Sequence, residues 1–316
     1  MAARKKPLSR GERAPDFTAP SRNGTPTRFY GIAGGKPTVI AFGAAVAAPE
    51  SVALFRVVEI AQASERPIFV DASGEIRALY GVAPGESRVF VLDANLRVLE
   101  SIAPGDAARI AEIVREPAVA ATEVVTQAPV LLVPNVLDPE ICGVLMQVFE
   151  ERGNVETGIE ETYEGMRGDF LRPEAKRRRD HVIADEELIG DLTNAVGRRV
   201  IPEVQRAFSF SATRFEGFKI ARYDAPHGHF LAHRDNLSHA TRHRRFALTL
   251  NLNDGYRGGA LRFPEYGPLL YRPPAGGALV FSGSLLHEVT PVTEGMRFVL
   301  LSFLFGEEDS RLRGHT

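Results

Sequence analysis

The sequence predicts a two-domain α+β protein, with an α/β domain followed by an all-β barrel or jelly roll that carries flanking helices. A length of 316 residues suits two domains at roughly 150 residues each. Short β-branched runs alternate with amphipathic stretches over residues 10–116, and short strands separated by Gly, Pro and Asn turns dominate from Arg214 onward. We therefore expect a basic tail (1–9), a first domain (10–117), a linker (118–127) and a second domain (128–316).

The composition excludes several classes of protein. With 44% hydrophobic and 25% charged residues the chain is neither disordered nor a coiled coil. A formal net charge of -2 gives no overall attraction to nucleic acid or to anionic lipid. The single cysteine, Cys142, excludes an intrachain disulfide, a Cys-rich zinc site and a two-cysteine redox cycle. Its apolar neighbours predict that it is a buried thiol.

The N-terminus is basic but lacks the apolar segment that a signal peptide requires. No run of 18 or more apolar residues occurs later in the sequence. We therefore predict a cytoplasmic protein with no membrane partner.

The first domain is predicted from alternating strand and helix patterns. Three apolar, β-branched runs indicate strands, and two stretches with helical spacing of apolar residues indicate helices that pack on the resulting sheet. The predicted strands are 37–42, 67–70 and 88–92, and the predicted helices are 49–63 and 106–115.

Several short segments of this domain resemble a peroxiredoxin, a peroxidase with the thioredoxin fold. They are Gly11–Phe17, the strand ending at Phe42, the Tyr80-Gly-Val turn and Arg88–Asp93, and the resemblance covers about the first 115 residues. Ala47 takes the place of the attacking thiolate, so there is no nucleophile for a peroxide. The resemblance therefore implies a non-catalytic thioredoxin-like domain that serves as a scaffold or protein-docking module, in which Arg88 has a structural role.

The second domain is predicted to begin with a strand at 128–137. Asp138-Pro139 then suits the start of a helix that runs to about Arg152, and apolar residues at intervals of four predict a second helix over 186–208. The charged stretch between them ends in the basic run 176–179. A solvated loop is the favoured interpretation of that stretch, and a mobile basic lid facing the substrate is the alternative.

The histidines are concentrated in one part of the second domain. Five of the eight lie at positions 227, 229, 233, 239 and 243. In His233-Arg-Asp235 the two outer side chains point to one face of a strand and can reach one ion. The apolar strand predicted for 278–287 ends in His287, which we propose as the third ligand. Two histidines and one carboxylate leave three metal positions open, as in Fe(II) oxygenases.

Arg297 follows His287 by ten residues and begins a strongly apolar strand. A guanidinium inside an apolar barrel needs an anion, and its planar fork binds a carboxylate bidentately. His227 and His229 form an alternative metal pair of the kind found in cupin-like barrels. We expect those two histidines to be loop or pocket-rim residues instead. The same expectation covers His239 and His243; Arg244 and Arg245 are expected in structural salt bridges, and Glu265 in a turn.

Four elements of the second domain together resemble an iron(II)/2-oxoglutarate-dependent oxygenase of the prolyl 4-hydroxylase type over about 128–308. They are Tyr223, His233-x-Asp235, the Gly-Gly segment 258–265 and the segment 287–297. The resemblance implies a double-stranded β-helix, with iron held by His233, Asp235 and His287. It also implies that Arg297 holds the distal carboxylate of 2-oxoglutarate and that Tyr223 helps to hold its other end. The sequence departs from the family at Ala247 and Asn251, where hydroxyl-bearing side chains often line the pocket.

The implied reaction is hydroxylation of a C–H bond in a protein residue or a small molecule. Fe(II) is the cofactor, 2-oxoglutarate and O2 are co-substrates, succinate and CO2 are released, and ascorbate is a candidate reductant. One alternative is a non-catalytic regulatory module that binds metal or 2-oxoglutarate and carries a degenerate peroxiredoxin domain. Another is a cupin-type metalloenzyme that uses His227 and His229. The lone cysteine lacks the setting that a thiol peroxidase requires. Neither the substrate nor the oligomeric state is identified by the sequence.

Overall fold

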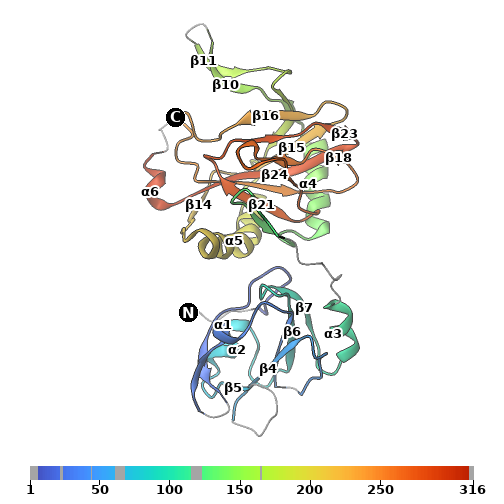
Figure 1. The fold of residues 1–316 in the computed structure, drawn as a ribbon, viewed down its shortest axis with the longest axis vertical. Helices are drawn as coiled ribbons and strands as arrows, with labels where there is room; N and C mark the ends of the chain where they lie inside the picture. Colours follow the sequence, from blue (N-terminus) through green and yellow to red (C-terminus); the bar gives the residue numbers. More distant parts are fainter. Residues whose placement is uncertain are drawn as a thin grey trace. The chain divides into compact units, whose positions relative to one another are not determined.

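The computed structural model describes residues 6–21, 24–43, 45–60, 68–114, 123–163 and 166–312. The chain divides into two compact units, Met1–Ala121 and Thr122–Thr316, and the division falls inside the stretch that the sequence suggests as a linker (Figure 1). Within the described ranges, no helix is both long enough and apolar enough to cross a membrane.

The N-terminal unit is built around a five-stranded mixed sheet in the order β5-β4-β3-β6-β7. The central strand, β3, is buried along its whole length, and it pairs in parallel with β4 and antiparallel with β6. Apolar clusters fill both faces of the sheet. The elements are β1 (Thr18–Pro20), β2 (Pro26–Arg28), α1 (Phe29–Ile32), β3 (Thr38–Phe42), β4 (Ala53–Val58), β5 (Ile68–Val70), α2 (Glu75–Tyr80), β6 (Arg88–Leu92), β7 (Val98–Ile102) and α3 (Ala107–Ile113).

The three predicted strands and the helix near 106–115 are present in this unit, but the helix predicted over 49–63 is wrong. Residues 53–58 of that range form the strand β4, because their β-branched and aromatic side chains fill both sides of a sheet that β3 and β5 complete. No helix is described between Phe42 and Ala53, where Ala47 lies. Arg88 is structural: its guanidinium binds Glu86 and the hydroxyl of Ser101.

The C-terminal unit consists of two facing antiparallel sheets. The larger has the order β8-β21-β17-β24-β15-β13-β9, with β14 paired to β24, and the smaller has the order β12-β16-β22-β19-β20. The strands of the larger sheet are β8 (Leu131–Val133), β9 (Val155–Glu156), β13 (Arg179–Val182), β14 (Arg214–Phe215), β15 (Lys219–Asp224), β17 (Phe246–Asn251), β21 (Ala278–Ser282) and β24 (Met296–Phe305). Those of the smaller are β12 (Lys176–Arg177), β16 (His229–His233), β19 (Leu261–Arg262), β20 (Leu270–Tyr271) and β22 (His287–Val289).

Two helices cover the outer face of the larger sheet, so the inner face is left for a site (Figure 1). They are α4 (Pro139–Glu151) and α5 (Glu186–Phe208), close to their predicted ranges. Cys142 on α4 is buried as predicted, and burial raises the pKa of its thiol to about 11. The remaining elements are β10 (Ile159–Tyr163) and β11 (Met166–Phe170), which form a projecting hairpin, with β18 (Arg257–Gly258), η1 (Pro264–Tyr266), β23 (Val292–Glu294) and α6 (Glu307–Ser310).

Two predictions for this unit are wrong. The charged stretch 153–180 is not a solvated loop, because it contributes strands to both sheets and Lys176 is buried. The single strand predicted over 278–287 is two strands: β21 belongs to the larger sheet and β22 to the smaller. The chain turns between them at Gly283, where an added Cβ would approach the carbonyl oxygen of Arg244 to 3.0 Å.

Candidate metal and carboxylate site

Strand pairing brings the two candidate metal-binding histidines together. His233 ends β16 and His287 begins β22, and the two residues lie directly opposite each other in the antiparallel register. Asp235 lies beyond the end of β16, so strand alternation alone does not orient it. Its backbone N–H donates to the carbonyl of Gly283 at 2.9 Å, and this bond turns the carboxylate toward the histidines.

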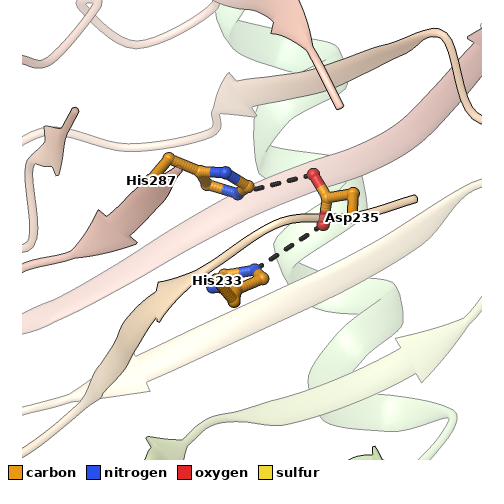
Figure 2. Close-up of side chains that lie close together, drawn as sticks. All are labelled: His233, Asp235 and His287. Carbon is orange, nitrogen blue, oxygen red and sulfur yellow. Dashed lines mark ion pairs between the residues drawn. The ribbon is translucent and has the colours of Figure 1, made fainter. Parts of the chain in front are cut away.

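The three side chains converge on one point. One ligand atom from each lies within 4.8 Å of the other two. The Nε2 atom of His233 is 3.6 Å from Oδ1 of Asp235, and that of His287 is 3.4 Å from Oδ2 (Figure 2). Among the described residues, no other group of three or more His, Cys, Asp or Glu side chains lies close enough together to hold one metal ion.

Backbone carbonyls orient both imidazoles for metal binding. Nδ1 of His233 lies 2.8 Å from the oxygen of Leu231, and Nδ1 of His287 lies 2.9 Å from that of Leu285. A carbonyl only accepts, so each Nδ1 carries the proton and each Nε2 presents its lone pair beside Asp235. Burial also lowers the pKa of His287, which favours the neutral ring that a metal requires.

Asp235 is held in its charged form. Burial by itself would raise the pKa of this carboxyl, but the polar and charged side chains around it, His233, His287 and Arg244, outweigh burial and lower the pKa. An ionised carboxylate and two neutral imidazoles are the donors of the two-histidine, one-carboxylate centre of Fe(II) oxygenases. The residues present therefore fit an iron(II) ion.

Polar side chains tie the two ligand-bearing segments to each other. Arg234, between the first two ligands, binds the carboxylate of Glu265 at 2.6 Å. That carboxylate also accepts from the backbone N–H of Leu286, next to His287, at 3.3 Å. Asn236 donates to the hydroxyl of Ser284 at 2.7 Å. Glu265 thus does more than anchor a turn, because it links the two histidine segments.

A second set of charged side chains contacts the backbone carbonyl of Asp235. Arg244 binds Glu216 through two nitrogens, at 2.5 and 2.7 Å, and its third nitrogen contacts the backbone oxygen of Asp235 at 3.5 Å. His243 lies in the turn before β17, which agrees with the loop alternative of the prediction, and it is not on the cavity rim. It is 2% exposed, and its Nε2 lies 2.8 Å from Glu216. Arg244 and Arg245 are salt-bridged as predicted, the latter to Asp309.

Arg297 is a deeply buried cation with no carboxylate partner among the described residues. It is 1% exposed, and its Nε and Nη2 donate to Oδ1 of Asn251 at 3.3 and 3.1 Å. The Asn251 amide is itself fixed, because its Nδ2 donates to the hydroxyl of Tyr256 at 2.9 Å and to the carbonyl of Pro273 at 2.6 Å. A buried guanidinium that is satisfied only by a neutral amide leaves a site for an anion.

Asn251 is the partner of Arg297 that the sequence does not assign to the candidate site. The sequence contains only an indirect signal for it, the departure from the hydroxyl-bearing side chains that often occur at this position. Its link to Arg297 depends on β17 and β24 lying side by side in the larger sheet.

Tyr223 and Gly259 complete the surroundings of Arg297. Tyr223 is buried on β15, opposite Arg297 on β24, and its ring centroid is 5.4 Å from the guanidinium carbon. Gly259 has a φ of +60°, and an added Cβ would lie 3.0 Å from Cδ of Arg297 and 2.9 Å from Val292. Only glycine leaves room for the arginine at this point of the Gly-Gly segment.

The alternative histidine pair does not form a comparable centre. His227 and His239 are exposed. Both ring nitrogens of His229 lie near backbone carbonyls, those of His227 at 2.7 Å and Glu174 at 3.2 Å. Within the described ranges, no third ligand joins His227 and His229. The cupin-type interpretation therefore lacks its metal site.

The predicted site residues line a single cavity of about 1370 Å³ in the barrel. His233, Asp235 and His287 contribute the metal-binding side, and Arg297 with Tyr223 contributes the anion-binding side. Ala247 also faces this cavity. The arrangement can hold a divalent metal, an organic acid and a further molecule.

Residues 218–305 match the family model of the 2OG-Fe(II) oxygenase superfamily. This segment contains all three candidate metal ligands, Arg297, Tyr223 and Asn251. The name of this family includes Fe(II) and 2-oxoglutarate, so the match implies Fe(II), 2-oxoglutarate and O2 for this segment.

The chain is also similar to curated hydroxylases over short segments. It is 33% identical over 88 residues to a PKHD-type hydroxylase of Verminephrobacter eiseniae, covering 25% of this chain and 39% of the relative. It is 42% identical over 62 residues to one of Bordetella pertussis, covering 18% of this chain and 27% of the relative. The chain thus spans less than two fifths of the length of each of these relatives.

The chain is also similar to two solved structures over somewhat more than half of its length. A prolyl hydroxylase from Trichoplax adhaerens, in complex with a hypoxia inducible factor peptide fragment, has a TM-score of 0.48 at 20% identity and covers 59% of this chain and 88% of its own. A Pseudomonas putida prolyl-4-hydroxylase has a TM-score of 0.42 at 18% identity and covers 56% of this chain and 92% of its own.

Proposed function

We propose that the protein is an iron(II)- and 2-oxoglutarate-dependent hydroxylase whose metal ligands are His233, Asp235 and His287. The observation that carries the proposal is the pairing of this metal-binding group with a buried, carboxylate-free Arg297 in one cavity, inside the segment that matches the oxygenase family. A structural metal site does not require a buried arginine beside it. A dicarboxylic co-substrate that chelates the metal requires the metal at one end and a cation such as Arg297 at the other.

The protein's own residues bind and orient the reactants. The Leu231 and Leu285 carbonyls hold the imidazoles so that Nε2 faces the metal position. Asn251 occupies one edge of the Arg297 guanidinium, which leaves the other edge for the distal carboxylate of 2-oxoglutarate. Tyr223, whose ring lies beside Arg297, helps to hold the other end of the co-substrate.

When bound, iron and 2-oxoglutarate supply the oxidising chemistry. One oxygen atom of O2 enters succinate as CO2 is released, and the other enters a C–H bond of the substrate as a hydroxyl group. The substrate is a protein residue or a small molecule. Stacking of Phe230 on His233 and the edge contact of Phe281 with His287 keep apolar surface around the metal position, which limits the access of water.

Metal and co-substrate titration tests the proposal. Anaerobic wild-type protein with Fe(II) and 2-oxoglutarate should develop the weak visible charge-transfer band of a chelated complex. His233→Ala should abolish the band, and Arg297→Met should require a much higher 2-oxoglutarate concentration while Fe(II) binding is retained. His239→Ala is the matched control, because this histidine is exposed and lies outside the cavity.

Succinate formation separates catalysis from binding alone. A hydroxylase releases succinate from 2-oxoglutarate in the presence of Fe(II), O2 and ascorbate, whereas a regulatory module that only binds the two ligands does not. Absence of the band in folded, Fe(II)-loaded wild-type protein would overturn the proposal itself.

The N-terminal unit is, in the same proposal, a thioredoxin-like scaffold that docks a protein partner. Its support is the sheet order β5-β4-β3-β6-β7, with parallel β3, β4 and β5 beside antiparallel β6 and β7, in a unit that contains no cysteine. Full-length protein should not consume hydrogen peroxide in the presence of a thiol reductant. Thiol-dependent turnover of peroxide would contradict this assignment.

A further inference from the structure

We infer that Arg178 forms a second carboxylate-binding site in the cavity, separate from the site at Arg297. This inference rests on the proposed function, since it concerns which molecules enter the same cavity. Arg178 lies outside the segment that matches the oxygenase family, and it belongs to the basic run that the sequence suggests is a loop.

The described side chains that line the cavity carry more positive than negative charge. Among the described residues that line it, six are Lys or Arg and two are Asp or Glu. An Fe(II) ion and doubly charged 2-oxoglutarate add no net charge between them. Arg234 and Arg244 each have a carboxylate of their own, Glu265 and Glu216. The excess of positive charge therefore lies elsewhere on the wall.

That excess lies where two cations share one carboxylate. Asp180 binds Arg178 at 2.7 Å and also lies 3.4 Å from Nζ of Lys219. Its side chain is 1% exposed and accepts a further hydrogen bond from the hydroxyl of Thr157 at 2.8 Å. One carboxylate neutralises only one of the two cations, so this part of the wall keeps a positive charge.

The guanidinium of Arg178 is held with one edge toward the cavity. Its Nε and Nη2 donate to the two oxygens of Asp180 at 2.7 and 2.8 Å. Its Nη1 makes only a long contact, 3.4 Å, with the hydroxyl of Tyr223, and this nitrogen has a second N–H without an acceptor among the described residues. The side chain is 10% exposed, so the available N–H lies in a largely desolvated position where a charged acceptor binds best.

The position of Arg178 suits a molecule that reaches the metal. Its guanidinium carbon is 5.7 Å from the ring centroid of Phe230, and that ring stacks on His233 at 3.6 Å. It is also 5.9 Å from the ring of Tyr223, on which Arg297 packs as well. One aromatic ring thus separates Arg178 from a metal ligand, and another separates it from the co-substrate arginine.

The ligand is a carboxylate, and it has two possible sources. It is either an acidic side chain or end group of the molecule that is hydroxylated, or the metal-proximal carboxylate of 2-oxoglutarate. In both cases the carboxylate accepts from Nη1 of Arg178 while Asp180 keeps the guanidinium in place.

A matched pair of probes tests this site in Zn(II)-loaded full-length protein, where no turnover occurs. N-acetyl-glutamate amide carries one carboxylate, and N-acetyl-glutamine amide is its neutral isostere. NMR titrations of each probe, with and without saturating 2-oxoglutarate, and a titration of 2-oxoglutarate itself are made on wild type, Arg178→Met and Arg178→Lys. Arg179→Met is the control, because Arg179 bonds Asn154 and lies outside the cavity lining.

We expect wild type to bind the acidic probe about tenfold or more tightly than the neutral one, as one charge-assisted hydrogen bond would give. Arg178→Met should remove that preference, Arg178→Lys should keep part of it, and Arg179→Met should keep all of it. A preference that persists with 2-oxoglutarate bound assigns the site to the hydroxylated molecule. Loss of 2-oxoglutarate affinity in Arg178→Met, with no preference between the probes, assigns it to the co-substrate.

The inference is overturned if Arg178→Met changes neither the probe preference nor the 2-oxoglutarate affinity. Because Arg178→Met leaves Asp180 with a weaker partner, the double variant Arg178→Met/Asp180→Asn is made in parallel and should also lose the preference. Failure of the proposed function would look different, since 2-oxoglutarate would then fail to bind wild type and the Arg297→Met variant would be indistinguishable from it.

Discussion

Replacing Asn251 by aspartate should block the co-substrate site from within. Asn251 Oδ1 already accepts from two nitrogens of Arg297, at 3.1 and 3.3 Å, so a carboxylate in its place would form an internal ion pair with the guanidinium. The distal carboxylate of 2-oxoglutarate would then have to bind one edge of the Arg297 guanidinium while the new carboxylate at position 251 occupies the other edge.

The size of the effect follows from Coulomb's law. Two carboxylates on opposite edges of one guanidinium lie roughly 6 Å apart, and at an effective dielectric constant of ~20 their repulsion is about 3 kcal/mol. We therefore expect Asn251→Asp to weaken 2-oxoglutarate binding about a hundredfold. Metal affinity should change little, because Asn251 contacts none of the three metal ligands.

The assay is titration of the anaerobic Fe(II) protein with 2-oxoglutarate, followed by the charge-transfer band, with Fe(II) affinity measured separately. Asn253→Asp introduces the same charge two residues away, where the side chain bonds the backbone of Met296 and Phe298 and does not line the cavity. If Asn251→Asp bound 2-oxoglutarate within about threefold of wild type while the control behaved normally, Arg297 would not be the co-substrate anchor.

Two further changes test the packing and the charges around the cavity. Gly259→Ala should lower the free energy of unfolding by about 1–2 kcal/mol, because alanine is strained in the left-handed backbone conformation of this position. The added Cβ should also displace Arg297. The affinity for 2-oxoglutarate, measured by the same titration, should therefore fall at least about tenfold. Unchanged affinity would show that Gly259 does not position the arginine. Burial would raise the pKa of Asp180, but Arg178 outweighs it and lowers the pKa. The ionised Asp180 therefore stabilises the fold above its unfolded pKa of about 3.9 and loses this effect as pH falls through the lower folded pKa. In urea unfolding, Asp180→Asn should be less stable than wild type by about 3 kcal/mol at pH 7, and this difference should shrink only below about pH 4. A difference that already shrinks between pH 7 and 5 would contradict an Asp180 with a lowered pKa.

The sequence alone was sufficient to select the residues of the candidate metal centre and to predict the three longest helices, α3, α4 and α5, with several of the strands. Apolar residues at intervals of four are a local property, and they predict α5 without reference to the rest of the chain. The order and spacing of His233-x-Asp235, His287 and Arg297 can also be recognised in the sequence, because these residue types carry the metal-binding and anion-binding chemistry themselves.

Features that depend on long-range pairing were decided only by the tertiary structure. Residues 53–58 have apolar spacing that suits a helix or a strand, and pairing with β3 selects the strand. The segment 278–287 divides because its two halves pair in different sheets, and the basic run 176–179 becomes a cavity wall because β12 and β13 pair with β16 and β15.

The same reason explains the site's supporting residues. Asn251, Glu216 and Glu265 lie far along the chain from the side chains they hold, so no local pattern connects them. Hydrogen bonds and ion pairs of this kind depend on distances of about 3 Å. Only the packing of the two sheets brings these groups within hydrogen-bond distance. The metal ligands, in contrast, are recognised in the sequence by their residue types and spacing.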